Sequence, residues 1–389
     1  MTDSQPIVAW QTLRPRMFAP RRRQAAAPFP LDSRSTEYYY LGRNAVFALA
    51  RAWDLAGQQV LVPAYCHGVE IKALLHAGAD LRFFPVREGM QVRPEDVIDR
   101  ITPRTRAVYL IHYVGFPGPV QELAAYCRDH NILLVEDCAL ALLSKLGDRP
   151  LGSFGDAAVF CLYKTLPLPN GGAAVVNGNR PGAIPASRRP SFSSTFAYTA
   201  AAMFRNAHLS GDGHDVADGD DGAERADHLI GRIRARAKPV FEKLELARVG
   251  SIEFNPAYLD LGMSGICHVA LANQDFDGIV GRRRRNYLQL LSRLRGKADT
   301  VFPDLPAGVC PLFFPIRTPN KVTLQERLLA RGIETVNFWF PHVPGVRPGD
   351  YPEVDHLRRT VLELPCHQDL TPEAIDRVAE EVCGQHAYL

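Results

Sequence analysis

Leu134-Val135-Glu136-Asp137-Cys138-Ala139 is the stretch of this 389-residue sequence that decides the fold. It is an apolar run that ends in two acidic residues, which predicts a buried strand with carboxylates at its C-terminal end. Open α/β sheets bind their ligands at the carboxyl ends of their strands. An Asp at a strand end also commonly hydrogen-bonds a neighbouring loop. By itself, the stretch therefore leaves a binding role and a structural role equally open.

The sequence on both sides of this stretch alternates short apolar runs with helical segments, a pattern typical of βαβ units. It predicts the α/β class, with a mostly parallel sheet covered by helices on both faces. The expected strands are 59–62, 81–84, 107–111, 132–135, 157–162 and 173–176, and the expected helices are 44–56, 69–76 and 120–129.

The chain is expected to form two domains after a loosely ordered arm. The expected divisions are a flexible N-terminal arm (1–36), a large α/β domain (37–280) with a variable segment (178–250), and a smaller α+β C-terminal domain (281–389). Inside the variable segment we expect a helix over 191–204, an acidic loop within 205–228 and a basic helix over 225–248. A helix over 276–294 should cross to the small domain, which is expected to contain a strand at 311–316 and helices at 324–331 and 372–383.

The composition is that of an ordinary globular protein, with 46% apolar and 22% charged residues. A formal net charge of +3 does not indicate binding to nucleic acid or to an acidic membrane. The basic runs 21–23 and 282–285 are interpreted as a mobile stretch and the solvated face of a helix. The eight cysteines contain no CxxC pair, so we expect no metal site and a reducing, cytoplasmic location. No apolar run predicts a signal core or a membrane span.

Lys164 is the second residue that carries chemistry. It follows the expected strand 157–162 and precedes the turn at Gly171-Gly172. A lysine in such a place is by itself most often a solvated surface group. Together with Asp137, however, it meets a specific need. An enzyme that uses pyridoxal 5'-phosphate (PLP) requires a lysine to hold the cofactor covalently and a carboxylate beside the pyridine nitrogen, so that the ring accepts electrons.

A series of short motifs then follows in one order along the chain, and it resembles the DegT/StrS-type sugar aminotransferases, a branch of the fold-type I PLP enzymes. The motifs are Val62-Pro63-Ala64-Tyr65, Ile101-Thr102-Pro103-Arg104-Thr105-Arg106-Ala107, His112 to Gly115, Glu136-Asp137, Gly152-Ser153-Phe154-Gly155-Asp156 and Leu364-Pro365-Cys366-His367. The resemblance implies the fold of fold-type I PLP enzymes, with a mostly parallel, seven-stranded type of sheet between helices and a smaller α+β C-terminal domain. It also implies a homodimer with shared active sites, in which PLP is bound by the large domain.

The resemblance also implies roles around the cofactor ring. Lys164 would hold the cofactor and then move protons, and Asp137 would hold the proton of the ring nitrogen. Ala139 would pack against one face of the ring. His67 occupies the place of an aromatic residue on the other face, although a lone His there is also compatible with an ordinary loop residue.

A second group of residues falls where the family binds the cofactor phosphate. Gly42, Arg43 and Asn44 would present a helix N-terminus to the phosphate, and Cys161 stands where many members have a serine. Arg43 is equally compatible with an exposed surface position. On the substrate side, the candidates are His112, His342 and His367. For His342 and His367 the alternative is an ordinary loop histidine.

The sequence departs from the family pattern at several positions. Leu140 stands where a Gln or His usually bonds the cofactor hydroxyl. Asp260 and Gly262 replace an Asn and an Arg that reach the partner's phosphate, and an anionic side chain cannot replace an amide donor there without cost.

We expect a PLP-dependent aminotransferase that moves an amino group from an amino acid to a carbonyl compound. The expected acceptor is a nucleotide-linked keto sugar or a secondary-metabolite carbonyl compound. Leu140 leaves open a PLP-dependent lyase, aldolase or racemase acting on an amino-acid-like substrate, whereas Lys164 argues against the dehydrating members, which have His there. A non-catalytic binding protein on the same scaffold is the alternative from another class.

Overall fold

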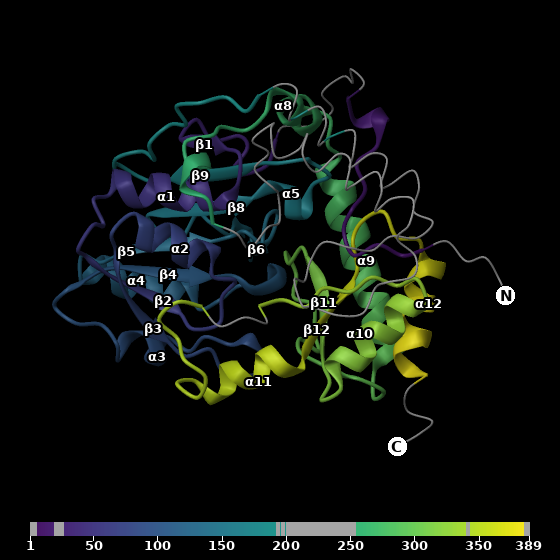
Figure 1. Ribbon diagram of the computed structural model, residues 1–389. Coiled ribbons are helices and arrows are strands. Elements are labelled where there is room, and N and C mark those ends of the chain that lie inside the picture. Colours follow the sequence, from purple (N-terminus) through teal and green to yellow (C-terminus); the bar gives the residue numbers. More distant parts are fainter. Residues whose placement is uncertain are drawn as a thin grey trace.

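The computed structural model describes residues 6–18, 27–191, 195, 199, 254–339 and 343–384 (Figure 1). Several expectations lie wholly or almost wholly outside these residues. They are the helix over 191–204, the acidic loop within 205–228, the basic helix over 225–248, the basic run 21–23 and His342.

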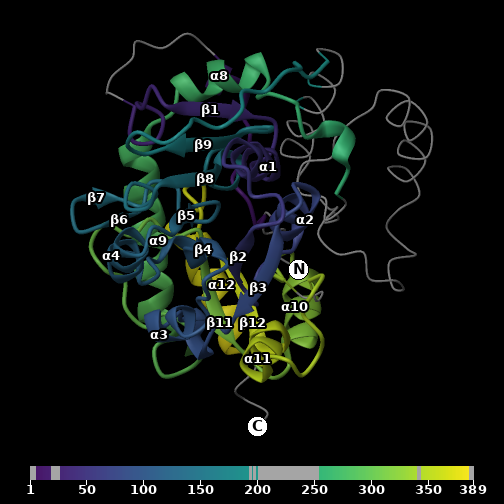
Figure 2. The same cartoon turned by 90° about the vertical axis from the view of Figure 1, so that its left-hand side faces the viewer.

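The centre of the fold is a seven-stranded sheet in the order β1-β9-β8-β5-β4-β2-β3. Figure 2 views it with β1 at one end and β3 toward the other. Strands β3, β2, β4, β5 and β8 pair in parallel, whereas β9 is antiparallel to both β8 and β1. The strands are β1 (Thr36–Tyr39), β2 (Gln59–Pro63), β3 (Asp80–Phe84), β4 (Thr105–Ile111), β5 (Leu133–Asp137), β8 (Ala157–Cys161) and β9 (Gly172–Val176).

Both faces of this sheet are buried, because alternate residues of one strand enter different hydrophobic clusters. In β2, Val60 and Val62 belong to one cluster and Leu61 belongs to the other. The first cluster includes the apolar residues of α1 (Gly42–Ala52) and α2 (Val69–His76), and the second includes those of α4 (Val120–Asp129). The expected α/β architecture, with helices on both faces, is confirmed.

Local sequence signals account for the helix ends. Helix α2 is followed by Gly78, whose φ of +90° favours glycine. Helix α9 (Phe276–Leu294) begins after Asp275, which accepts a hydrogen bond from the Gly278 N–H, and α12 (Pro372–Cys383) begins after Thr371, which accepts one from the Ala374 N–H. Shorter helices are α3 (Pro94–Ile98), α5 (Leu162–Thr165) and α8 (Gly265–Ala272).

A second, antiparallel sheet of three strands follows α9 in the chain. It consists of β10 (Asp299–Thr300), β11 (Phe313–Arg317) and β12 (Val361–Pro365) in that order. The helices of this part are α9, α10 (Lys321–Ala330), α11 (Pro352–Thr360) and α12. In Figure 1 this sheet lies beside the large one, with α9, α10 and α12 around it. A two-stranded ribbon, β6 (Lys145–Leu146) with β7 (Arg149–Pro150), completes the described strands.

The expectation of a free N-terminal arm is wrong for the described residues 7–13. Ile7, Ala9 and Leu13 are 4%, 4% and 5% exposed. The Ile7 N–H donates to the Gly332 carbonyl over 2.7 Å, and the Trp10 ring packs edge-on against Phe313 with centroids 4.8 Å apart. The Pro- and Arg-rich composition did not indicate that these residues are buried, because the residues they contact are distant in sequence.

The basic run 282–285 also departs from expectation, since it is not wholly a solvated face. Arg283 is 1% exposed and points into the interior from α9. Its guanidinium group donates to backbone carbonyls and side-chain amides rather than to solvent. Runs of like charge do not reveal which member faces inward, because that depends on how the helix packs.

Two further findings concern the class of protein. All eight cysteines are free thiols, and all but Cys383 are buried. Among the described residues, none of the helices combines the length and the apolar character needed to cross a membrane.

Candidate active site

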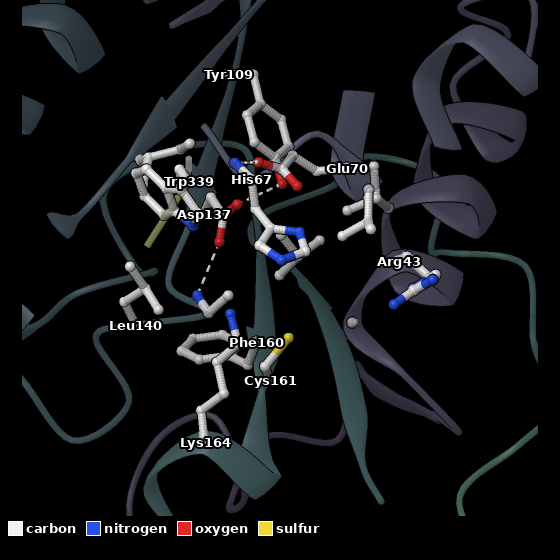
Figure 3. Close-up of a pocket in the computed structure, with 16 residues that line it drawn as sticks. Arg43, His67, Glu70, Tyr109, Asp137, Leu140, Phe160, Cys161, Lys164 and Trp339 are labelled. Carbon is white, nitrogen blue, oxygen red and sulfur yellow. Dashed lines mark hydrogen bonds between the residues drawn. The ribbon is translucent and has the colours of Figure 1, made fainter. Parts of the chain in front are cut away.

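The candidate site lies at the carboxyl edge of the large sheet. Strands β2, β4, β5 and β8 run in parallel, so their C-terminal ends meet at one edge. A pocket there is lined by Asp137 at the end of β5, by Cys161 at the end of β8 and by Lys164 of α5 (Figure 3). The N-terminus of α1 and the segment before α2 complete its wall.

Asp137 is held at both carboxylate oxygens. Its Oδ2 accepts a hydrogen bond from the Tyr109 hydroxyl over 2.7 Å, and its Oδ1 accepts one from the Ala139 N–H over 2.8 Å. The side chain is buried, and burial raises the pKa of the Asp137 carboxyl group above its ordinary value. A positively charged group beside this fixed carboxylate would offset the cost of its burial.

Lys164 reaches the pocket because the chain makes one helical turn directly after β8. This turn is α5, which begins after Cys161 and ends at Thr165. The Lys164 Nζ lies 5.9 Å from the centroid of the Phe338 ring, which belongs to the C-terminal part of the chain. The turn therefore brings the Lys164 side chain into the pocket that Asp137 also lines.

His67 lines the pocket from the loop between β2 and α2. Its backbone N–H donates to Glu70 Oε1 over 2.8 Å, and this hydrogen bond fixes the backbone of the loop. Its Nδ1 is buried and has no hydrogen-bond partner within the described part of the chain. Burial, and then the positive charges of Lys164 and Arg43, lower the pKa of the His67 ring to about 3, so the ring is neutral at pH 7.

The N-terminus of α1 packs tightly against the end of β8. A Cβ atom on Gly42 would lie 2.2 Å from the Cys161 Sγ, so a side chain at this position would require Cys161 to shift. Leu41 precedes the helix and provides no side-chain cap. Burial raises the pKa of the Cys161 thiol, which is therefore a neutral neighbour of this helix end. Arg43 also lines the pocket.

Comparison with known proteins supports the relationship suggested by these motifs. Residues 42–181 match the sequence model of the DegT/DnrJ/EryC1/StrS aminotransferase family. Over these residues, which are less than half of the chain, the sequence is similar to this family. The matched region contains Gly42, His67, Asp137 and Lys164, whereas Leu41 and Phe338 lie outside it.

The individual proteins that this chain resembles are distant in sequence. A GDP-perosamine synthase of Vibrio cholerae is 32% identical over 126 residues, which are 32% of this chain and 34% of that protein. A UDP-N-acetyl-3-dehydro-alpha-D-glucosamine 3-aminotransferase of Acidithiobacillus ferrooxidans is 26% identical over 352 residues, which are 87% of this chain and 80% of that protein. The first match thus spans about a third of its relative's length.

Solved structures share the fold. The crystal structure of S. venezuelae DesV superposes with a TM-score of 0.64 at 21% identity and covers 91% of this chain and 85% of its own. Helicobacter pylori PseC, an aminotransferase of pseudoaminic acid biosynthesis, gives 0.65 at 16% identity and covers 91% of this chain and 87% of its own. The predicted fold class is thereby confirmed.

Three of the residues expected in the site do not line the pocket, namely Asn44, His112 and His367. The Asn44 side chain donates to the carbonyls of Tyr258 and Leu261 over 2.7 and 3.3 Å. Its backbone N–H already donates to the Leu41 carbonyl. Asn44 therefore supports the segment around residue 260, whereas Gly42 and Arg43 line the pocket.

His112 is the second, because it is fully buried and both its ring nitrogens are used within the protein. Its Nε2 lies 3.0 Å from Glu136 Oε2, and its Nδ1 accepts from the Gly118 N–H. Glu136 also accepts from the backbone N–H groups of residues 152, 154 and 155. The expectation that His112 contacts substrate is corrected: this network braces the strand that ends at Asp137.

His367 is likewise placed against the protein rather than the pocket. It is 2% exposed, and its Nε2 lies 3.0 Å from the Val8 carbonyl. Burial lowers the pKa of the His367 ring to about 4. The N-terminal segment, which was expected to be a free arm, contacts this ring, and His367 does not line the pocket, so the expectation of an acceptor-side role is corrected.

The pocket also contains residues that the sequence did not single out, namely Tyr109, Glu70 and Trp339. The position of Tyr109 in the site could have been predicted. It lies in β4 two residues before Ile111, on the same face of the sheet, and Ile111 pairs with Asp137. Glu70 follows His67 by three residues, a spacing that lets a carboxylate return to the backbone at a helix start. Trp339 comes from the distant C-terminal part, and no local pattern links it to the pocket.

The departures from the family pattern have structural counterparts. Leu140 does line the pocket, where it presents an apolar side chain. Asp260 forms a two-pronged ion pair with Arg188 of the same chain, with N–O distances of 2.8 and 2.9 Å. These hydrogen bonds lower the pKa of the Asp260 carboxyl group, so its negative charge is already balanced.

Proposed function

We propose that this protein is a PLP-dependent aminotransferase that moves an amino group from an amino acid to the carbonyl group of a nucleotide-linked keto sugar. The observation that carries the proposal is the pairing of Asp137 and Lys164 in one pocket at the carboxyl edge of the sheet, with both oxygens of Asp137 fixed. A fixed carboxylate and a lysine amine are the two groups that PLP chemistry requires of its protein.

The pocket fits the cofactor in three respects. The buried, unpartnered Nδ1 belongs to a neutral His67 ring, which suits a residue that covers a flat pyridine ring. The N-terminus of α1 has no side-chain cap, and such helix ends bind phosphate through backbone N–H groups and the helix dipole. The Asp137 carboxylate is fixed by two neutral donors, a hydroxyl and a backbone N–H, so its charge suits a protonated ring nitrogen.

The roles of the chain follow from this fit. PLP, when bound, supplies an electron sink next to the substrate carbon that loses its proton. Asp137 would keep a proton on the ring nitrogen through its negative charge, and Tyr109 and the Ala139 N–H hold its carboxylate in place. Lys164 Nζ would hold the cofactor at rest and carry a proton between substrate atoms during turnover. Arg43 and Gly42 would bind the phosphate, beside the neutral Cys161 thiol.

The choice of acceptor rests on the relatives. Their names include a GDP-perosamine synthase, a dTDP-4-dehydro-2,3,6-trideoxy-D-glucose 4-aminotransferase and a UDP-linked sugar 3-aminotransferase. The chain shares the catalytic region with them, so a nucleotide-linked keto sugar is the acceptor that the comparisons favour. A secondary-metabolite carbonyl compound remains the other acceptor class to be tested.

Separate half-reactions test the proposal. Purified protein with PLP is mixed with glutamate or glutamine, and the visible spectrum is followed. An aminotransferase converts the aldehyde form of the cofactor to the amine form, and a keto sugar linked to GDP, dTDP or UDP then restores it. Retention of the aldehyde form with every donor would contradict the proposal and favour the lyase, aldolase or racemase alternative. A Lys164→Ala protein serves as the control.

The assembly and location belong to the same proposal. We propose a homodimer in which neighbouring subunits complete each other's sites, within a reducing cytoplasm, for which the eight free thiols are the support. We also propose that residues 37–280 and 281–389 act as a cofactor-binding domain and a smaller substrate-closing domain, with α9 joining them.

A further inference from the structure

Three backbone carbonyls in and beside the turn that carries Lys164 accept hydrogen bonds from side chains elsewhere in the chain. Gln11 Nε2 donates to the Tyr163 carbonyl over 2.7 Å and to the Leu166 carbonyl over 2.9 Å. The Thr165 carbonyl accepts from Gln368 Nε2 over 3.2 Å and from Arg283 Nη2 over 3.3 Å. The carbonyls of the residues on both sides of Lys164 are thus held by side chains from distant parts of the chain.

The guanidinium group of Arg283 links these side chains. Arg283 is 1% exposed, and no carboxylate is among its hydrogen-bond acceptors in the described residues. Its Nε donates to Gln368 Oε1 over 2.7 Å and its Nη2 to Gln11 Oε1 over 3.2 Å. Its Nη1 donates to the carbonyls of Pro311 and Leu312. These contacts match the five N–H groups that a guanidinium possesses.

The turn has few hydrogen bonds of its own, so the contacts from these side chains matter for its conformation. Helix α5 has only four residues, and such a short helix leaves its last carbonyls without helical partners. In this turn the Leu166 N–H donates back to the Leu162 carbonyl over 2.9 Å. The orientation of the Lys164 backbone therefore depends on the side chains that bind the carbonyls around it.

We propose that Gln11, Arg283 and Gln368, here called the Lys164 clamp, are positioning residues that hold Lys164 for its covalent link to the cofactor. The inference rests on the proposed function, since it assumes that Lys164 forms that link. In the linking step the neutral Lys164 amine condenses with the aldehyde carbon, a C=N bond forms and one water leaves. The step requires the amine at a defined distance and angle from the aldehyde.

Two cofactor forms separate positioning from general support. Pyridoxal phosphate forms the covalent link, whereas pyridoxamine phosphate fills the same pocket without one. If the clamp positions Lys164, its loss weakens binding of the aldehyde form and spares the amine form. If it merely supports the pocket, its loss weakens both forms alike.

The test compares Gln11→Leu with Thr12→Val in the full chain freed of cofactor. Thr12 is the matched control, because its hydroxyl donates to Asp369 over 2.9 Å in the same segment and belongs to no part of the clamp. For Gln11→Leu, which loses two hydrogen bonds to the turn, we expect the dissociation constant of pyridoxal phosphate to rise about tenfold. That of pyridoxamine phosphate should stay within about twofold. Thr12→Val should change neither.

Arg283→Lys provides a second variant, since it keeps the charge but offers three N–H groups in place of five. It should show the same split between the two cofactor forms. Equal weakening of both forms, or no change in either, by Gln11→Leu would overturn the clamp. Borohydride labelling of the unaltered protein keeps the two claims apart. A label on a residue other than Lys164 refutes the proposed function. A label on Lys164, together with an unchanged ratio of the two dissociation constants in Gln11→Leu, refutes only the clamp.

Discussion

Replacement of Asp137 by Asn isolates the charge of this side chain from its shape. The oxygen of the new amide can accept from the Ala139 N–H as Asp137 Oδ1 does. The amide nitrogen then faces the Tyr109 oxygen, which can rotate its hydroxyl hydrogen and accept instead of donating. The side chain keeps its place in the pocket, but no negative charge remains beside the ring nitrogen.

The expected loss is therefore one of rate. We expect the single-turnover rate of the donor half-reaction to fall about 10²-fold, which corresponds to about 2.7 kcal/mol and is the scale for removing one major electrostatic stabiliser. The stability of the folded protein should not decrease. Burial raises the pKa of Asp137 in the folded state. The free energy of unfolding therefore falls as the pH rises above the ordinary pKa of an aspartate, because the unfolded state ionises more easily. The cofactor-free variant should unfold at neutral pH no more readily than the original.

The assay is stopped-flow absorbance with a saturating amino donor, and Tyr109→Phe is the matched control. Tyr109→Phe removes one hydrogen bond to Asp137 but leaves the charge, so we expect a loss of at most about tenfold. A near-normal rate for Asp137→Asn, or a larger loss for Tyr109→Phe, would refute the view that charge is what Asp137 contributes.

Three further outcomes are expected. The cofactor-free His67→Phe protein should lose less stability than the original as the pH falls from about 6.5 toward 3. In the original, the folded pKa of His67 is lowered to about 3, so the unfolded state takes up the proton first and acid favours unfolding. Equal loss of unfolding free energy with falling pH in urea denaturation would contradict this. Cys161→Ser should lower the dissociation constant of PLP by about twofold to tenfold, because a hydroxyl is a better donor to phosphate than a neutral thiol, and fluorescence titration that shows weaker binding would refute the placement of the phosphate. Sedimentation should give a dimer of the 43.1 kDa chain, and a fully active monomer would refute the shared site.

The elements that were predicted well are those whose signals are local. The helices expected over 69–76, 120–129, 276–294 and 372–383 coincide with α2, α4, α9 and α12, since amphipathic spacing is a local signal, and Asp275 and Thr371 cap the starts of the last two. The parallel strands were visible as short apolar runs. By contrast, β1 is held by antiparallel pairing to β9, more than a hundred residues away, and its own sequence Thr-Glu-Tyr-Tyr gives no alternation.

The site divides in the same way. Lys164 and Asp137 follow apolar strands and belong to recognisable motifs, so the sequence suggested both, and the structure places them in one pocket. The surroundings depend on packing between distant segments. His367 looked like a substrate ligand because nothing in the sequence shows that residue 8 covers it. Arg283 looked solvated because its five acceptors come from four separate segments.

The most direct test of the central claim is to locate the covalent bond to the cofactor. The protein is saturated with pyridoxal phosphate, reduced with borohydride, digested and mapped by mass spectrometry. The account predicts a single labelled peptide that contains Lys164, and a Lys164→Ala protein that takes up the cofactor without a reducible bond. A label on another lysine, or none in protein that retains a visible absorption band with PLP, would contradict it.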